Sequence, residues 1–188
     1  MGNRVHFIGI AGGTGAGKTT LAGKLLAALG EEAGLLHLDH YFRPGTPTHN
    51  RPEAIDCGKL LADMDRLQAG ICVEVKNRVG ELYTIEPRPL IFIEGHLLLC
   101  FPEVRERLDL AVYIDLDSDE RVVRRICRNV ERFGMPLAQV AAWYLSDAKE
   151  GHDRFIEPTR RYADLIIWGD LKERSINALL AAVKALQS

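Results

Sequence analysis

The feature that most constrains the fold of this chain is the stretch "IGIAGGTGAGKTTLAGKLL", Ile8 to Leu26. The apolar run at Val5–Ile10 predicts a buried strand, glycines and alanines follow it, and a helical pattern begins at Lys18. Within this stretch, "GGTGAGKT" (Gly12 to Thr19) matches the phosphate-binding loop G-x-x-x-x-G-K-[ST]. We therefore expect a strand, a loop and a helix that bind the phosphates of a nucleotide.

The residue types of this loop have a physical reason. Small residues let successive backbone N–H groups turn inward around an anion, and the following helix adds its positive N-terminal end. Lys18 supplies a compact charge to the β- and γ-phosphates, and Thr19 offers a hydroxyl to Mg²⁺. The residues expected to bind the nucleotide are Gly13, Thr14, Gly15, Ala16, Gly17, Lys18, Thr19 and Thr20.

Short, continuously apolar strands alternate with helical patterns along the rest of the chain, which predicts parallel strands buried on both faces. We expect an α/β protein with the three-layer P-loop NTPase fold: a central parallel sheet, a helical lid and a small hairpin on the substrate side. Residues 1–188 would form one kinase domain, with the lid at about 118–136 and the hairpin at about 70–86. Further strands are expected at Leu35–Leu38, Leu90–Ile93, Ala111–Ile114 and Leu165–Ile167. Helices are expected at Lys18–Leu29, from Asp56 to Gly70, from a cap at Asp117 or Ser118 to about Arg132, at Leu137–Lys149 and from Asp170 to about Leu186. The last helix would begin with Asp170 and Glu173 as a capping box.

Composition excludes several classes of protein. A formal net charge of -2 gives no bulk attraction to nucleic acid, so no nucleic-acid partner is expected. The longest apolar run, "PLIFIEGHLLLCF", is too short to span a membrane. The four cysteines lie far apart, which suits reduced thiols in a cytoplasmic protein, and the first residues run directly into a strand, so we expect no signal peptide.

Two carboxylates are predicted at the carboxyl ends of strands, where ligands bind in open parallel sheets. Asp39 follows the second strand and could accept the proton of an attacking hydroxyl. Glu94 ends the strand "LIFIEG", where it could hold a metal ion or a water. The plainer alternatives are a turn cap for Asp39 and a solvated acid for Glu94. No Asn-Lys-x-Asp motif of a GTPase is present.

The stretch "DERVVRRICRNVER" predicts a helix rich in arginine. A solvated basic face is the plain interpretation. We favour a lid, because this helix follows a core strand and would lie beside the same strand ends, where its arginines could stabilise a transferring phosphoryl group. Arg124, Arg125 and Arg128 are the expected phosphate contacts.

These stretches together resemble the uridine kinase family of P-loop kinases, with its phosphoribulokinase and pantothenate kinase relatives. The resemblance covers nearly the whole chain and rests on motifs that occur in a fixed order. They are "GIAGGTGAGKTT", "LDHYFR", "NRPEAIDCGKLLADMDRLQAG", "LIFIEGHLLL", "VYIDLDSDERVVRRICRNVERFG" and "RFIEPTRRYADLII".

The resemblance implies a Mg²⁺-dependent kinase that transfers the γ-phosphate of ATP to a primary hydroxyl, the 5′-hydroxyl in nucleosides. The residues expected to carry catalysis are Asp39, Lys18, Arg124 and Arg128, with Arg125 on the nucleotide. The expected metal set is Thr19, Glu94 and Asp39, and the expected acceptor contacts are Asp39, Phe42, Arg43, His49 and Asn50.

The chain departs from the family pattern mainly on the acceptor side. Asn50 stands where the family has a ribose-binding Asp, Met135 replaces a lid arginine, and Asn129 replaces an Asp. The hairpin lacks the family's base-contacting Pro-x-Tyr-Asp. The acceptor therefore stays open between a nucleoside and a pantothenate-like or sugar-phosphate-like molecule. A regulatory module that binds ATP without catalysis is a further alternative, and the sequence leaves both the choice between ATP and GTP and the formation of a homo-oligomer open.

Overall fold

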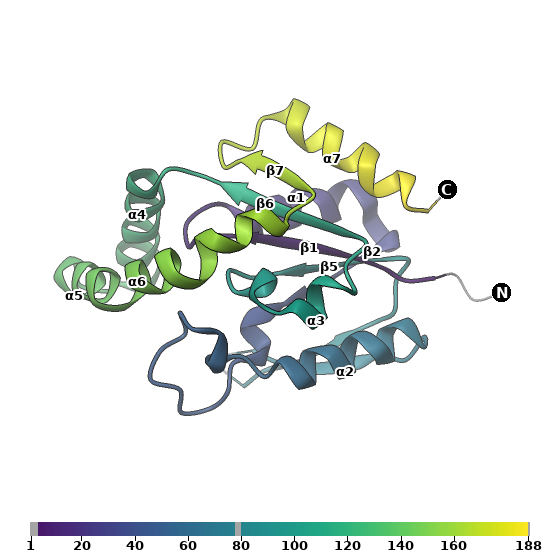
Figure 1. The fold of residues 1–188 in the computed structure, drawn as a ribbon, viewed down its shortest axis with the longest axis horizontal. Helices are drawn as coiled ribbons and strands as arrows, with labels where there is room; N and C mark the ends of the chain where they lie inside the picture. Colours follow the sequence, from purple (N-terminus) through teal and green to yellow (C-terminus); the bar gives the residue numbers. More distant parts are fainter. Residues whose placement is uncertain (1–3, 78–79, 188) are drawn as a thin grey trace.

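The computed structural model describes residues 4–77 and 80–187 and has a five-stranded sheet at its centre (Figure 1). The strand order is β2-β5-β1-β6-β7, and every neighbouring pair is parallel. The strands are β1 (His6–Gly12), β2 (Ala33–His37), β5 (Leu90–Glu94), β6 (Leu110–Asp115) and β7 (Leu165–Trp168). The predicted α/β class with a central parallel sheet is confirmed.

Helices cover both faces of this sheet, which makes three layers (Figure 1). On one face, α1 (Lys18–Leu29) and α7 (Glu173–Ala185) pack their leucines against β1, β5 and β6. On the other face, α2 (Cys57–Gln68) and the short α3 (Pro102–Arg105) complete a second apolar cluster. Because both faces are covered, β5 is buried along its whole length, as its unbroken apolar sequence predicts.

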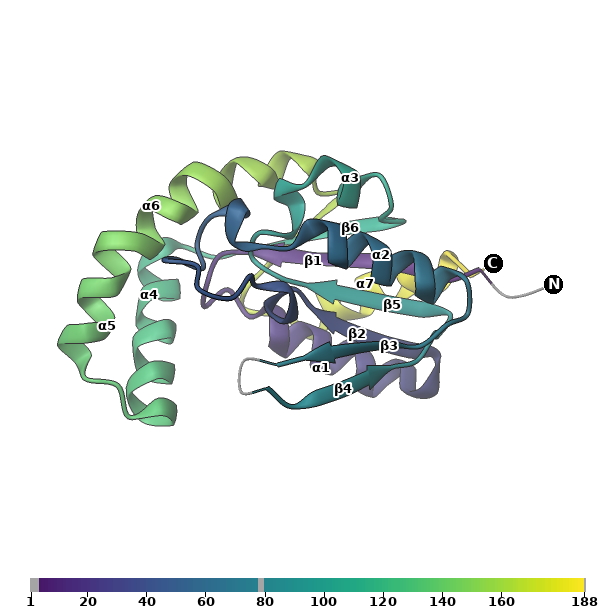
Figure 2. The ribbon, with the colours of Figure 1, turned by 90° about the horizontal axis from the view of Figure 1, so that it is seen from below.

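A small antiparallel hairpin, β3 (Val73–Lys76) with β4 (Leu82–Ile85), lies beyond the edge strand β2 (Figure 2). Val73 and Val75 are buried, while the alternate residues of β3 are exposed. This alternation with period two is typical of a strand with one face on a core. The hairpin predicted from residues 71–85 is confirmed, and Arg78 and Val79 of its turn lie outside the described residues.

A helical arm projects beyond the carboxyl ends of the strands (Figures 1 and 2). It consists of α4 (Ser118–Cys127), α5 (Leu137–Trp143) and α6 (Lys149–Gly151), and α4 and α5 contact each other. π-helical stretches extend α4 to Arg132 and carry the chain from α5 through α6 to residue 156. The second helix of the arm is therefore longer than the predicted Leu137–Lys149.

The capping box predicted for the last helix is wrong. The N-cap of α7 is Lys172, without a side-chain hydrogen bond, and the Asp170 carboxylate is instead paired with the Lys172 ammonium at 2.9 Å. The four cysteines are free thiols, which agrees with their spacing. Across residues 4–77 and 80–187, every helix is too short or too polar to cross a membrane.

Candidate active site

The loop between β1 and α1 has a geometry that demands glycine. Gly12 and Gly15 have φ angles of 138° and 79°, which side chains rarely tolerate. A Cβ at Gly12 would lie 2.5 Å from the Ile114 carbonyl oxygen, and one at Gly15 would lie 2.4 Å from the Arg121 carbonyl oxygen. The loop is therefore held closely between β6 and α4. Its backbone leads directly into the N-terminus of α1, which gives the predicted cradle for an anion.

Lys18, the first residue of α1, points its ammonium back across this loop. Its Nζ donates hydrogen bonds to the carbonyl oxygens of Gly12, at 3.0 Å, and Gly13, at 2.9 Å. Burial lowers the pKa of Lys18 from its ordinary value, while the charges of Glu94 and Asp39 act in the opposite direction. The lysine thus lies within the loop that it was predicted to serve, close to both predicted carboxylates.

Glu94, the last residue of β5, is 8% exposed and is the centre of a small polar cluster. Its Oε1 accepts a hydrogen bond from the Thr19 hydroxyl at 2.9 Å and lies 2.8 Å from Nδ1 of His37. Burial alone would raise the pKa of Glu94, but the His37 hydrogen bond and the Lys18 charge outweigh it and lower that pKa. A buried carboxylate beside the hydroxyl of the phosphate loop is an arrangement of hard oxygen ligands suited to Mg²⁺.

His37 was not predicted as a site residue. It ends β2 and is the register partner of Glu94 on the neighbouring strand β5. The hydrogen bond with Glu94 raises the pKa of His37 above its ordinary value. The signal in the sequence was its position at a strand end, two residues before Asp39, because adjacent parallel strands bring such residues together.

Asp39 lies in the short 3₁₀ turn that follows β2. It lines a cavity of about 640 Å³ that also contains Lys18, Thr19 and Glu94. A second cavity, of about 220 Å³, adjoins the first at the loop and α4 and is lined by Gly17 and Thr20, among others. The structure thus gathers the predicted phosphate and metal residues into adjoining cavities.

The predicted lid arginines reach these cavities from α4 and its extension. Arg125 donates from Nη1 to the Thr14 hydroxyl at 3.0 Å, and its guanidinium lies 4.9 Å from the ring centre of Trp143. Arg128 lines both cavities, whereas Arg124 lines only the smaller one and donates to the Gly169 carbonyl oxygen at 2.9 Å. The arginine-rich helix therefore has a face that points to the phosphate loop, and it is more than a solvated surface.

The rest of the lining of the larger cavity includes His49, Asn50, His96, Asn129, Phe133, Met135 and Trp143. We call this part of the lining the acceptor side, because His49 and Asn50 were expected to contact the acceptor. The His96 ring nitrogen Nε2 lies 2.8 Å from the His49 carbonyl oxygen. The side chain of Asn129 is buried, and its Oδ1 has no hydrogen-bond partner within the described part of the chain. This side therefore combines aromatic surface with neutral polar groups.

Four predicted site residues, Gly13, Ala16, Phe42 and Arg43, do not line either cavity. The Phe42 ring stacks at a tilt on the His49 ring, with 4.3 Å between ring centres. Arg43 donates from Nε to the Ile55 carbonyl oxygen at 3.3 Å and lies near Asp56, so its guanidinium is directed toward the start of α2. Ala16 is fully buried. The side chains of Phe42 and Arg43 thus do not reach the larger cavity, where they were expected to contact the acceptor.

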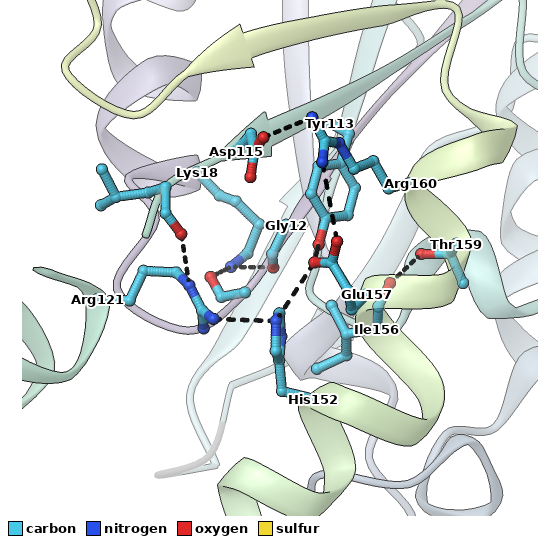
Figure 3. A network of polar contacts seen from close by, with 12 residues as sticks. Gly12, Lys18, Tyr113, Asp115, Arg121, His152, Ile156, Glu157, Thr159 and Arg160 are labelled. Atoms are coloured by element: carbon cyan, nitrogen blue, oxygen red, sulfur yellow. Dashed lines mark hydrogen bonds and ion pairs between the residues drawn. The ribbon is translucent and has the colours of Figure 1, made fainter. Parts of the chain in front are cut away.

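A buried polar network lies beneath the phosphate loop (Figure 3). Arg121 of α4 is 4% exposed, donates from Nε to the Leu116 carbonyl oxygen at 2.9 Å, and has Nη2 2.9 Å from His152 Nε2. Because arginine only donates, the His152 ring must accept this bond through a neutral Nε2. Burial and the neighbouring Arg121 charge lower the pKa of His152 to about 4.

The same network continues to the end of the helical arm. The Tyr113 hydroxyl donates to Glu157 at 3.1 Å, His152 Nε2 lies 3.5 Å from that carboxylate, and Arg160 pairs with Asp115 at 2.7 Å (Figure 3). A Cβ at Gly13 would lie 2.5 Å from Arg121 Nη1, so the guanidinium directly supports the loop. No local motif in the sequence indicates this support, because Arg121 and His152 lie 31 residues apart along the chain.

Comparison with known proteins agrees with this geometry. A family model described as "Phosphoribulokinase / Uridine kinase family" matches residues 39–172, more than half of the chain. The chain belongs to the phosphoribulokinase/uridine kinase family. The resemblance stated from the motifs is thereby confirmed, and the protein is a member of a family of P-loop kinases.

Curated members of the phosphoribulokinase/uridine kinase family are similar over almost the whole chain. The uridine kinase of Halobacterium salinarum is 38% identical over 194 residues, which cover 95% of this chain and 86% of that protein. The uridine kinase of Clostridium perfringens is 32% identical over 199 residues, covering 96% of both.

Solved structures share the fold at lower identity. A protein from Silicibacter sp. TM1040, described provisionally as a fructose transport system kinase, has a TM-score of 0.74 at 20% identity and covers 89% of this chain and 91% of that chain. Phosphoribulokinase from Rhodobacter spheroides has a TM-score of 0.64 at 14% identity, with 88% and 70% coverage. These similarities confirm the predicted fold and carry no information on the acceptor.

Proposed function

We propose that the protein is an ATP- and Mg²⁺-dependent kinase that phosphorylates the 5′-hydroxyl of a nucleoside. The observation that carries the proposal is that Asp39 lines the same cavity as Lys18, Thr19 and Glu94. A carboxylate thus lines the cavity in which the loop would hold the γ-phosphate. The uridine kinase names of relatives at 32% and 38% identity support a nucleoside as the acceptor.

In the proposed reaction, Asp39 accepts the proton of the acceptor hydroxyl as its oxygen attacks the γ-phosphorus. The bond between the acceptor oxygen and the γ-phosphorus forms, and the bond from that phosphorus to the β–γ bridging oxygen breaks. The bonding electron pair leaves with ADP. Lys18, Arg125 and Arg128 lie where they would stabilise the negative charge on the transferring group.

The residues present fit a magnesium ion. Within the described part of the chain, no three His, Cys, Asp or Glu side chains form a ready-made metal cluster. Mg²⁺ in kinases uses one or two carboxylates and keeps waters and substrate phosphates as its other ligands, so a full protein cage is not needed. Thr19 and Glu94 would hold the ion, with Asp39 near it. When bound, the ion neutralises charge that develops on the phosphates.

The test is a transfer assay with γ-labelled ATP and a panel of uridine, cytidine, adenosine, guanosine, pantothenate and ribose 5-phosphate. We expect a labelled nucleoside 5′-phosphate. Replacement D39N should lower kcat by about 10²-fold or more, the usual size of a general-base effect, while ATP affinity is retained. The matched control is D153N, which neutralises an exposed carboxylate on the arm and should leave the kinetics unchanged.

Each outcome of this assay has a clear meaning. Tight ATP binding without labelled product from any acceptor would favour the regulatory module over the kinase. Labelling of pantothenate or ribose 5-phosphate in preference to nucleosides would overturn the nucleoside proposal and retain the kinase. Near-normal turnover by D39N would remove Asp39 as the base.

A further inference from the structure

The Asp147 carboxylate of the helical arm binds two residues, Thr48 and Asn50, of the loop between Phe42 and α2, which we call the acceptor loop. Its two oxygens lie 2.6 Å and 2.8 Å from the Thr48 hydroxyl, and Asn50 donates to it from Nδ2 at 2.6 Å. The Asn50 backbone N–H in turn donates to the Thr48 hydroxyl at 3.0 Å. These three residues, which we call the Asp147 cluster, connect positions that are 97 and 99 residues apart in sequence.

The Asn50 side chain has little freedom within this cluster. Asn50 is 6% exposed, and Gly151 on the next turn of the arm packs directly on it. A Cβ at position 151 would lie 2.5 Å from the Asn50 carbonyl oxygen and 2.6 Å from its Cβ. The side chain that lines the acceptor side of the larger cavity is therefore held between the arm and its own loop.

The chemistry of the carboxylate determines how the Asn50 amide is turned. An ionised carboxylate only accepts hydrogen bonds, so the NH₂ end of the amide must face Asp147. The Oδ1 end must then point away from Asp147. Asn50 lines the larger cavity, so Oδ1 is the end of its amide that can meet an acceptor there.

We propose that Asp147 is a positioning residue that determines acceptor specificity by presenting the Asn50 amide oxygen to the acceptor. The inference rests on the proposed function and deepens it. The acceptor group that meets Asn50 is an uncharged hydrogen-bond donor, a hydroxyl or an N–H. A phosphate or carboxylate at this place would meet an oxygen lone pair backed by a negative charge, which selects a nucleoside over a sugar phosphate.

The proposal is tested by steady-state kinetics with uridine and ATP varied separately, on wild type, D147N, N50D and N50D/D147N. In D147N the neighbouring amide can donate as well as accept, so the Asn50 amide loses its single orientation. We expect the KM for uridine to rise about 10-fold, the effect of one net hydrogen bond, with the KM for ATP and kcat within about twofold. D153N is the matched control on the same arm.

The other two variants keep the test decisive if D147N folds poorly. N50D places two carboxylates in contact, so it should lower the Tm and raise the KM for uridine. N50D/D147N restores one carboxylate and one amide with their positions exchanged, and it should recover the Tm and bring the KM to within about threefold of wild type. Recovery by the double variant separates an effect of amide orientation from simple loss of packing.

The results that would overturn the inference differ from those that would overturn the proposed function. An active wild type whose uridine KM is unchanged in D147N removes the role of Asp147 and leaves the kinase standing. A KM that rises equally for uridine and ATP, or a double variant no better than N50D, also removes it. Two results for the wild type would overturn both the inference and the proposed nucleoside kinase. One is a KM for ribose 5-phosphate below that for every nucleoside, and the other is no phosphorylation of any nucleoside.

Discussion

Acid should destabilise this protein through one buried histidine, His152. In the folded state the His152 ring accepts a hydrogen bond from Arg121, and its pKa is lowered to about 4 by burial and by the Arg121 charge. In the unfolded chain the ring returns to the ordinary value of about 6.5. Between these values the unfolded state binds a proton that the folded state does not, so the free energy of unfolding falls as pH decreases.

The magnitude follows from the two pKa values. At pH 7.5 the ring is neutral in both the folded and the unfolded state, so its titration does not change the free energy of unfolding. At pH 5 the unfolded ring is almost fully protonated while the folded ring is not, which lowers the free energy of unfolding by about 2 kcal/mol. The loss approaches about 3 kcal/mol below pH 4, since each pKa unit corresponds to about 1.4 kcal/mol.

The assay is urea unfolding of wild type and H152Q, followed by circular dichroism between pH 7.5 and pH 5. Glutamine can accept the Arg121 hydrogen bond through its amide oxygen but does not titrate, so the difference in stability between the two proteins should shift by about 2 kcal/mol in favour of H152Q at pH 5. Parallel pH profiles of wild type and H152Q would refute the reasoning.

Three further predictions concern the site. R125K removes the guanidinium that contacts both Thr14 and Trp143, so kcat/KM for ATP should fall about 10-fold. The exposed control R132K should leave kcat/KM unchanged, and equal kinetics in the two variants would contradict a role for the Arg125 contacts. E94Q should raise the Mg²⁺ concentration for half-maximal activity about 10-fold or more, measured by magnesium titration; an unchanged titration would remove the metal role. G151A should lower the Tm and raise the acceptor KM by displacing Asn50; a thermal melt and KM equal to wild type would contradict that close packing.

The elements with strong local signals were predictable from sequence. The helix Lys18–Leu29 begins after the glycine loop and ends at Gly30 as expected, and α2 begins at the expected place, with Asp56 as its N-cap. The apolar strands also fall within a few residues of their predicted positions. These elements combine hydrophobic periodicity with glycine or capping residues at their ends, and both signals lie within a few residues of sequence.

The parts that sequence reasoning missed depend on contacts between distant segments. His37 meets Glu94 through strand register across 57 residues, and Asp147 meets Asn50 across 97. The arm extends past Lys149 through π-helical stretches, which the apolar pattern did not reveal. Asp170 resembles a cap in sequence but bonds to Lys172 instead. Packing and local competition between hydrogen bonds determine these contacts, and a linear sequence motif contains no information on either.

We propose that main-chain amides and the Lys18 ammonium bind the triphosphate so that an alcohol can be phosphorylated. The most direct measurement compares ATP affinity, by calorimetry, and the rate of phosphoryl transfer for wild type and K18A, with the exposed K24A on the same helix as control. The account predicts that K18A weakens ATP binding about 10-fold or more and slows transfer about 10²-fold or more, while K24A changes neither. Wild-type affinity and wild-type transfer in K18A would contradict it.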